Sequence, residues 1–306
     1  MKKSYIAAFS YSLVVGLSFL VTKLVVPHAS SNLILAHRFT IAFIGYGLML
    51  ILRGEKLQFT KKKVLKILPL TVFYPLLFFS FQVYGLNHAT SSEAGIIFAL
   101  VPILVIMIGA LTKNIPNLSQ TVSIVLSVTG VLVIFSRNTA SFNGNTEGIV
   151  LLFLSALSSA IYTIVLKKMV SKVNIHELTF LIILVGFMLF NLMSGLELYQ
   201  NQSHLRDYAA PFESLHYVFG IIYLGLFASV GASFASNYAI QKLSAPQFSV
   251  FSNLSTLISI VAGGLILKES LSVQHYLGSL LILIGVIGVN FSHLFDDGFI
   301  LSFKRT

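Results

Sequence analysis

The sequence has no cysteine, and it has few charged residues for its length. Without cysteine the chain can form neither a disulfide nor a metal site with thiolate ligands. Asp, Glu, Lys and Arg make up 10% of the 306 residues, whereas ordinary soluble domains carry about 25%. So few charges cannot cover the surface of a soluble protein of this size.

Four long stretches contain no Asp, Glu, Lys or Arg: Ile67–Ser92, Asn114–Ser136, Leu243–Leu267 and Ser270–Phe295. A membrane-spanning helix needs about 20 predominantly apolar residues. Segments of this kind lie at residues 5–26, 33–52, 67–86, 94–112, 119–136, 148–167, 178–197, 217–239, 246–267 and 274–292. We therefore predict an all-α integral membrane protein with ten transmembrane helices, which leaves no room for a soluble domain.

The positive charges predict the orientation of these spans. If the N-terminus is cytoplasmic, fifteen of the 20 Lys and Arg residues lie on the cytoplasmic side. The other side carries only Arg137, Arg206 and Lys268, while Lys23 and Arg38 lie within spans. This is the positive-inside pattern of a multi-pass plasma-membrane protein with both termini in the cytoplasm. The net charge of +10 is thus a topology signal, and we expect no nucleic-acid partner.

The first span, about Tyr5–Val26, follows Lys2 and Lys3 much as a signal peptide would. Its apolar run is too long for a signal peptide, and no clear small-residue cleavage site follows it. We expect it to be retained as the first helix.

The second half of the chain repeats the first. Tyr84–Gly109 aligns with Tyr238–Gly263 at a constant offset, and the order of spans and loops matches. Five helices is an odd number, so the second copy must enter the membrane upside down, which is a recurrent construction of secondary transporters. The predicted units are two inverted five-helix repeats at residues 1–136 and 147–293, followed by a cytoplasmic tail at 294–306.

Small residues recur at a shared spacing in the fifth and tenth spans. Ser123 and Gly130 are seven residues apart, as are Gly278 and Gly285. Seven residues make two helical turns, so each pair lies on one face, where small side chains allow helices to approach closely. We predict packing rather than substrate binding for these two spans.

Several motifs together suggest a family. They are His37-Arg38-Phe39, Val15-Gly16-x-Ser18-Phe19 with Lys23, Leu86-Asn87-x-Ala89 with Leu100-x-Pro102, and Lys268-Glu269-x-Leu271-Ser272. With these motifs in this order, the chain resembles the drug/metabolite transporter superfamily, EamA type. It departs in having Val15 where the family has Trp, and in having no first-half acid equivalent to Glu269. The resemblance implies a secondary transporter or exporter of metabolites, amino acids among them.

Polar side chains within the spans are the candidates for substrate binding, because in lipid they must face the protein interior or a wet cavity. We expect no catalytic residue, no metal ligand and no cofactor. The candidate substrate-binding residues are Lys23, Arg38, Tyr74, Gln82, Tyr84, Glu93, Tyr162, Asn237, Tyr238, Gln247 and Asn253.

The charged candidates each have two interpretations. Lys23 could attract a carboxylate or extend to the membrane surface. Arg38 could bind a carboxylate as a bidentate fork, or it could cap carbonyl groups and pair with a neighbouring helix. Glu93 could bind a proton near the transport pathway, or it could be an acid favoured at a helix N-terminus. Ser91 and Ser92 fit the cap of such a helix.

The uncharged candidates are also ambiguous. Tyr84 and Tyr238 could be aromatic anchors at opposite membrane surfaces. Asn253 belongs to a polar face of the ninth span that could be a cavity wall or a packing contact. Pro75 and Pro102 interrupt their helices, and each kink could be a hinge or a static bend.

We predict a secondary transporter that exports a small metabolite, such as an amino acid, by alternating access around a central cavity between the repeats. The expected partners are the lipid bilayer and a small-molecule substrate, with proton coupling as an option. No phosphate-binding loop ending in Gly-Lys-Ser/Thr is present, so ATP is not the direct energy source. The alternatives are a passive channel and an intramembrane enzyme, although His176-Glu177 lacks the second His of a metalloprotease motif.

Overall fold

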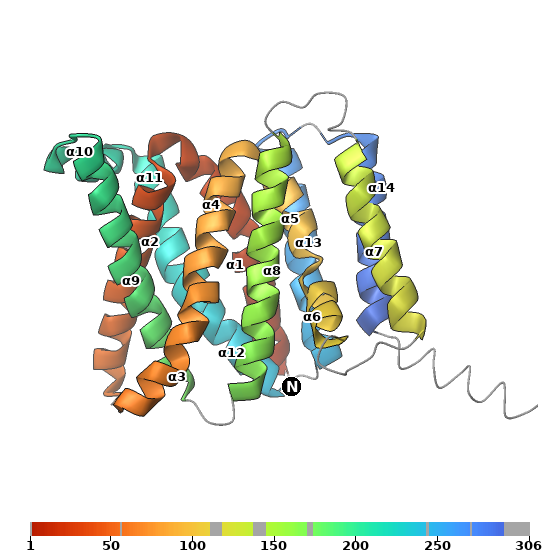
Figure 1. Cartoon of the computed structure of the whole chain (residues 1–306), viewed down its shortest axis with the longest axis horizontal. Coiled ribbons are helices and arrows are strands. Elements are labelled where there is room, and N and C mark those ends of the chain that lie inside the picture. The colour runs from red at the N-terminus through yellow and green to blue at the C-terminus, as the bar shows by residue number, and fades with distance from the viewer. Residues whose placement is uncertain are drawn as a thin grey trace, which may run out of the picture.

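The computed structural model describes residues 2–55, 57–110, 118–136, 145–169, 174–242, 245–269 and 271–290. Every regular element within these ranges is a helix, and the long helices stand side by side in an upright bundle (Figure 1). The all-helical class predicted from the sequence is confirmed.

The helices of the first half follow the expected spans closely, because each apolar run ends in polar or turn-forming residues. Their bounds are α1 Lys2–Val25, α2 Ser31–Arg53, α3 Lys61–Thr71, a π-helical segment Val72–Leu77, α4 Phe78–His88, α5 Ser91–Phe98, α6 Val101–Ala110 and α7 Leu118–Ser136. A short 3-10 turn, Val26–His28, follows α1.

The second half has the same order of long helices and one addition. The bounds are α8 Asn145–Met169, α9 Ile175–Gln200, α10 Leu205–Ala209, a 3-10 turn Ala210–Glu213, α11 Leu215–Ile222, a π-helical segment Tyr223–Gly231, α12 Ala232–Lys242, α13 Ala245–Ile266 and α14 Val273–Asn290. The short α10 was not expected. It forms because Asp207 accepts a hydrogen bond from the backbone N–H of His204 at 2.8 Å and closes a capping box.

Among the described residues, seven helical stretches are long and apolar enough to cross a membrane: Lys3–His28, Ser31–Arg53, Lys61–His88, Ser91–Gly109, Thr146–Leu166, His176–Gln200 and Leu215–Ser236. Three shorter apolar helices, Leu118–Gly130, Leu254–Ile266 and Val273–Gly288, lie at the expected fifth, ninth and tenth spans. The chain is a multi-pass membrane protein.

The third and eighth spans are both broken by π-helical segments. The offset that places Tyr84 on Tyr238 is 154 residues, and it places Val72–Leu77 inside the segment Tyr223–Gly231. Tyr74 leaves helical geometry altogether, with φ −143° and ψ 110°. π-Helical turns inside α-helices are often found at functional sites. In the second segment, the hydroxyl of Ser229 donates to the Leu224 carbonyl at 2.9 Å.

The fourth span is also interrupted. α5 ends at Phe98 and α6 begins at Val101, one residue before Pro102. Proline has no backbone N–H and is favoured in the first turn of a helix, so it starts α6 rather than continuing α5.

α7 and α14 pack tightly against each other at one side of the bundle (Figure 1). A Cβ added to Gly130 would lie 2.6 Å from the backbone oxygen of Gly278, and one added to Gly285 would lie 2.5 Å from that of Ser123. The backbones therefore touch where the sequence places small residues, which confirms the predicted close packing.

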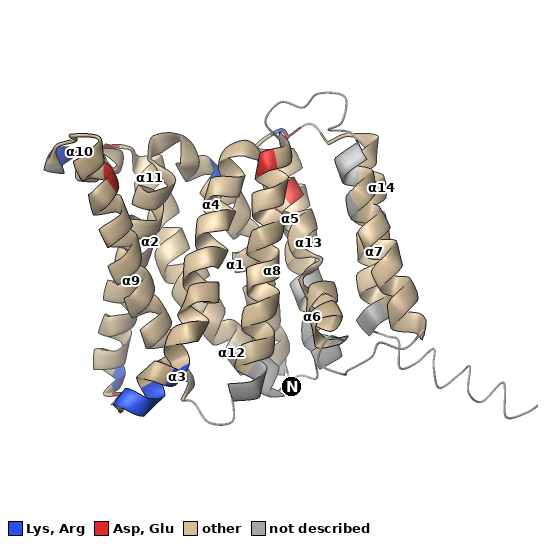
Figure 2. Cartoon of the chain, viewed as in Figure 1, with Lys and Arg blue, Asp and Glu red and all other residues tan. Residues whose placement is uncertain are grey.

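Charged residues gather at the two ends of the bundle (Figure 2). Basic residues cover the lower end of α3, where Lys63 pairs with Glu177 at 3.0 Å. Acidic residues lie at the upper ends of α5 and α8. The middle of the bundle is apolar at its surface, as a lipid-embedded protein requires.

Candidate functional site

Arg38 is a cation buried within the bundle. α2 begins at Ser31, and Ser30 caps it by accepting the backbone N–H of Leu33. At 1.5 Å per residue, Arg38 lies about 10 Å along the helix from its start. Its side chain is only 2% exposed. A guanidinium held this deep needs partners, because burying an unpaired charge is costly.

The contacts of Arg38 leave part of its guanidinium open. Nε donates to the hydroxyl of Ser229 at 3.0 Å, and the guanidinium carbon lies 4.2 Å from the centroid of the Phe79 ring. Nη1 is buried and has no hydrogen-bond partner among the described residues. The ion pairs found in the described ranges do not include Arg38. The site therefore offers a cation with an unused donor.

The π-helical break in the eighth span is what presents Ser229 to Arg38. The Ser229 hydroxyl donates its hydrogen to the Leu224 carbonyl, so its oxygen is left to accept from Nε. The sequence interpretation of Arg38 as a residue that pairs with a neighbouring helix is thus correct for one edge of the guanidinium. At the other edge, Nη1 is buried without a partner among the described residues.

Aromatic side chains surround this cation. The Tyr74 ring lies 5.1 Å from the Phe79 ring, centroid to centroid, and Tyr223 also lies near Arg38. The Tyr74 ring stacks on that of Tyr162 with 4.9 Å between centroids, and the Tyr223 hydroxyl donates to the Val14 carbonyl at 2.8 Å. Helices α1, α2 and α8 and both π-helical segments therefore contribute to one polar–aromatic centre.

A second polar cluster lies at the upper ends of α4 and α5. The Lys23 ammonium donates to the carbonyls of Leu86 and Ala89, both at 2.7 Å. It caps the C-terminus of α4, where orphan carbonyls and the helix dipole favour a cation. The two sequence interpretations, membrane-surface extension and carboxylate attraction, did not include this role.

Glu93 forms a capping box with Thr90. The backbone N–H of Thr90 donates to Oε2 of Glu93 at 2.9 Å, and the backbone N–H of Glu93 donates to the Thr90 hydroxyl at 3.1 Å. The cap is thus Thr90, and the sequence-based choice of Ser91 or Ser92 is wrong. Those two serines have another partner.

That partner is Glu269, from the segment between α13 and α14. Oε1 accepts from the backbone N–H and hydroxyl of Ser91 at 2.7 and 2.9 Å. Oε2 accepts from the same two groups of Ser92 at 3.0 and 2.6 Å. The carboxylate satisfies the N–H groups at the start of α5, so the two halves of the chain are joined here.

The remaining candidates do not share one location. Gln82 is buried, whereas Tyr84 and Tyr238 are 38% and 43% exposed. Partial exposure on the outside of the bundle fits the aromatic-anchor interpretation of these tyrosines. The side chains of Asn237, Gln247 and Asn253 lie outside the part of the chain that the structure describes.

Sequence reasoning missed Phe79, Ser229 and His275. Phe79 is one of 26 phenylalanines, and Ser229 is an ordinary small residue of a membrane helix. His275, which lies 3.1 Å from Glu93, carried a usable signal as an ionisable residue at the start of an uncharged span.

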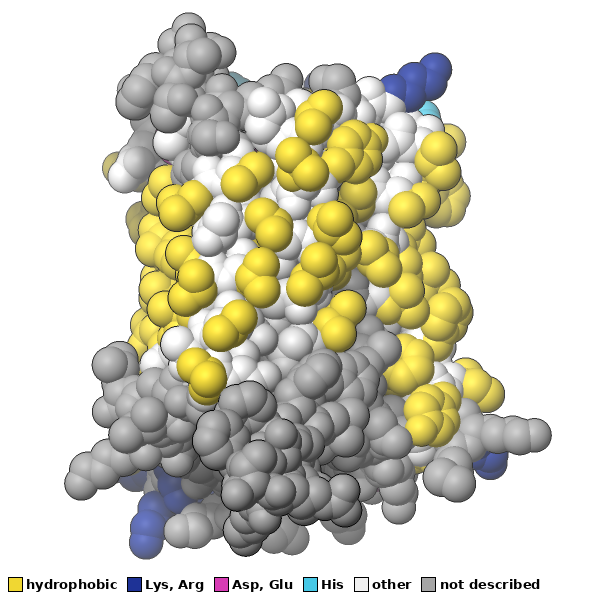
Figure 3. Space-filling view, turned by 90° about the vertical axis from the view of Figure 1, so that its right-hand side faces the viewer, with side chains coloured by type: hydrophobic (Ala, Val, Ile, Leu, Met, Phe, Trp, Pro, Cys, Tyr) yellow, Lys and Arg dark blue, Asp and Glu magenta, His cyan; other side chains and the backbone are white. Residues whose placement is uncertain are grey.

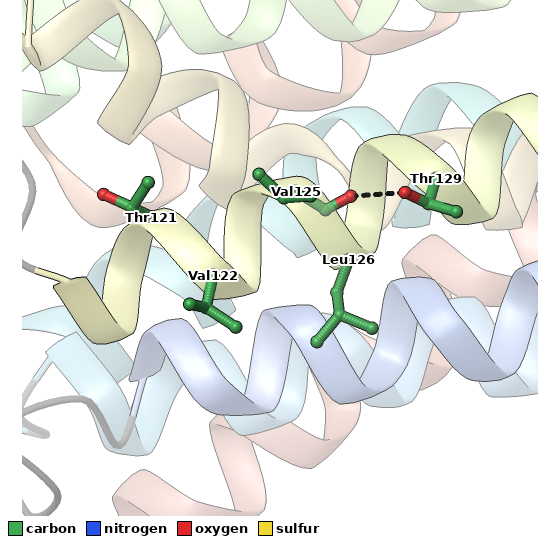
Figure 4. Close-up of a pocket in the computed structure, with 5 residues that line it drawn as sticks. All are labelled: Thr121, Val122, Val125, Leu126 and Thr129. Atoms are coloured by element: carbon green, nitrogen blue, oxygen red, sulfur yellow. Dashed lines mark hydrogen bonds between the residues drawn. The ribbon is translucent and has the colours of Figure 1, made fainter.

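One surface hollow lies elsewhere, on α7. It measures about 300 Å³ and is lined by Thr121, Val122, Val125, Leu126 and Thr129 (Figure 4). The Thr129 hydroxyl donates to the Val125 carbonyl of its own helix, so the hollow presents mainly apolar surface. Hydrophobic side chains are spread over the described part of this face (Figure 3), as expected for a face that contacts lipid.

The comparisons with known proteins agree on a family. Residues 2–136 and 146–291 each match the EamA-like transporter family. The uncharacterized transporter YcxC of Bacillus subtilis is 40% identical over 289 residues, which cover 94% of this chain and 92% of the relative. An uncharacterized transporter of Archaeoglobus fulgidus is 28% identical, with 89% and 92% coverage.

One solved crystal structure of a protein is also similar. It has a TM-score of 0.61 at 16% identity, and the match covers 94% of this chain and 96% of the other. At this identity the similarity concerns the fold alone.

Proposed function

The chain belongs to the EamA-like transporter family, and we propose that it is a secondary transporter that exports a small metabolite such as an amino acid. The transported molecule carries a carboxylate in this proposal. Buried Arg38, with an unpartnered Nη1, is the observation that supports it. Leaving a buried donor unsatisfied costs about 1–3 kcal/mol, and a carboxylate oxygen would remove that cost.

The surroundings of Arg38 favour a substrate that is only partly polar. Phe79 covers one face of the guanidinium, and the stacked pair Tyr74 and Tyr162 lies beside it. Binding sites for small molecules commonly combine apolar and aromatic walls with a few fixed polar groups. An amino acid with an apolar side chain would meet both kinds of surface.

We propose ten spans in two inverted repeats, at residues 1–136 and 147–293, with the shorter apolar helices completing the count. The repeats would rock around the centre at Arg38 in alternating access. The π-helical breaks in the third and eighth spans support this, because they are equivalent under the repeat and both adjoin Arg38. The chain would lie in the plasma membrane with both termini and the tail 294–306 in the cytoplasm.

Counterflow in proteoliposomes tests the function. The liposomes are loaded with one unlabelled compound, and uptake of the same compound in ¹⁴C-labelled form is followed for a panel of L-amino acids and other small carboxylates. We expect accelerated exchange for at least one compound. A passive channel would give no counterflow, and absence of exchange across the panel would overturn the carrier proposal.

Substitution of Arg38 tests the site. Arg38→Ala should abolish exchange, and Arg38→Lys should leave little of it, because a lysine keeps the charge but not the planar fork. Arg206→Ala is the matched control, since the Arg206 side chain is 88% exposed and pairs weakly with Glu213 at 3.9 Å. If the Arg38→Ala variant inserts normally and exchanges substrate at the rate of the unmodified chain, Arg38 is not part of the substrate site.

A further inference from the structure

Glu93 and His275 form a buried pair that joins helices from the two halves of the chain. Nε2 of His275 lies 3.1 Å from Oε1 of Glu93, and the side chains are 6% and 2% exposed. Glu93 lies in the first turn of α5, and His275 lies in the first turn of α14. The contact therefore ties the upper ends of these two helices together.

The hydrogen bonds fix where the proton of the imidazole lies. The backbone N–H of Ser272 is directed at Nδ1 of His275, at 3.2 Å. A backbone N–H can only donate, so Nδ1 accepts and carries no hydrogen. The single ring hydrogen is then on Nε2, where it is donated to Glu93, and the imidazole is neutral.

A hydrogen-bond acceptor for a second proton, on Nδ1 of His275, is already present. The hydroxyl oxygen of Ser272 lies 2.8 Å from Nδ1. A hydroxyl can accept as well as donate, so it can accept from Nδ1 once that atom is protonated. The imidazolium would then donate to the Ser272 hydroxyl and to Glu93, while the backbone N–H of Ser272 gives up Nδ1 as its acceptor.

The charges around the pair favour this proton. Lys23 interacts electrostatically with Glu93 and with Glu269, so one ammonium faces two carboxylates and an imidazolium would balance the second. By sequence, α6, α7 and α13 carry no Asp, Glu, His, Lys or Arg, and α1 and α8 carry further lysines only at their lower ends. The other charged or histidine residues near the upper ends of the neighbouring helices are exposed. They are His88, Glu147 and Lys268.

We propose that the Glu93–His275 pair is a proton-binding site, and that a proton bound at Nδ1 of His275 locks the upper ends of α5 and α14 together. The proton comes from the aqueous phase, and no covalent bond other than N–H changes. An imidazolium–carboxylate hydrogen bond is stronger than the neutral one it replaces. A consequence that rests on the proposed transport function is slower exchange when the upper side is acidic.

Proton binding can be measured without any substrate. The purified full chain in nanodiscs, labelled with ¹⁵N-histidine, is titrated from pH 8 to pH 5 by NMR. One histidine signal should start as the tautomer with hydrogen on Nε2 and convert to imidazolium, and it should be missing in His275→Gln. If that signal stays in one protonation state across the range, the proposal is overturned. If His275→Gln does not fold, Glu93→Gln identifies the signal by shifting it.

A second measurement tests whether the bound proton holds the upper ends of α5 and α14 together. The melting temperature of the unmodified chain is compared with that of Ser272→Ala, which removes the hydroxyl acceptor but keeps the Glu93–His275 pair. The gap between the two melting temperatures should widen by about 2 °C or more from pH 7.5 to pH 5.5, because the bound proton makes the Ser272–His275 hydrogen bond charge-assisted, and only the unmodified chain has that bond. His28→Gln, at an exposed histidine, should show no such widening. A constant gap would overturn the lock, and neither measurement depends on whether transport is observed.

Discussion

The guanidinium of Arg38 lies over the ring of Phe79, 4.2 Å from its centroid. Phe79 belongs to α4, directly after the π-helical break of the third span, and it is 3% exposed. The same guanidinium is held at Nε by Ser229, inside the break of the eighth span. One cation is therefore positioned by contacts from both irregular spans.

Phe79→Leu should weaken substrate binding without preventing membrane insertion. The substitution removes the aromatic face beneath the cation, and a desolvated cation–π contact contributes up to about 2 kcal/mol. We expect the half-saturating concentration in counterflow to rise by roughly tenfold, since 1.4 kcal/mol corresponds to a factor of ten. Phe219→Leu, at a residue 69% exposed, is the control and should leave it unchanged. An unchanged value for Phe79→Leu would show that the ring does not support the site.

Lys23→Met should lower stability rather than substrate affinity. The ammonium caps the carbonyls of Leu86 and Ala89, and losing these bonds should cost about 1–3 kcal/mol. Thermal unfolding of the purified variant measures this loss, and Lys61→Met at an exposed lysine is the control. A large rise in the half-saturating concentration with unchanged stability would instead assign Lys23 to substrate binding.

Gly285→Ala should destabilise the α7–α14 pair. The new Cβ would collide with the Ser127 hydroxyl and lie 2.5 Å from the Ser123 carbonyl oxygen, so a backbone must move. Overpacking of this kind costs about 1–3 kcal/mol. Gly195→Ala is a matched control, because nothing lies within 4 Å of its added Cβ. Equal melting temperatures for the two variants would contradict the tight packing.

The absence of cysteine allows the topology to be mapped by single cysteine substitutions in an otherwise unmodified chain. In intact cells, a membrane-impermeant maleimide should label Arg206→Cys but not Lys61→Cys. Ser141→Cys should be labelled and Asn117→Cys should not, because these two positions flank α7. If both of these cysteines are labelled, or neither is, α7 does not cross the membrane. The number of spans would then be lower than the proposed ten.

Local sequence patterns were enough to predict the fold class and part of the candidate site. Apolar runs of about 20 residues and the distribution of charge are written along the chain, so helix positions follow from them closely. Arg38, Tyr74 and Tyr162 could be selected because polar groups are costly in lipid wherever they occur. Thr90 was missed as the cap of α5 because three adjacent hydroxyl residues, Thr90, Ser91 and Ser92, are equally suitable by type.

The sequence alone determined that this is a helical, multi-pass membrane protein, because hydrophobicity and charge act residue by residue. It also pointed to Arg38 as an unusual group. Only the tertiary structure decided which partners these groups have: Phe79 and Ser229 for Arg38, His275 for Glu93, and Glu269 for the start of α5. Those pairings depend on how helices far apart in sequence pack, and packing is set by the shapes of whole helix faces rather than by any local pattern.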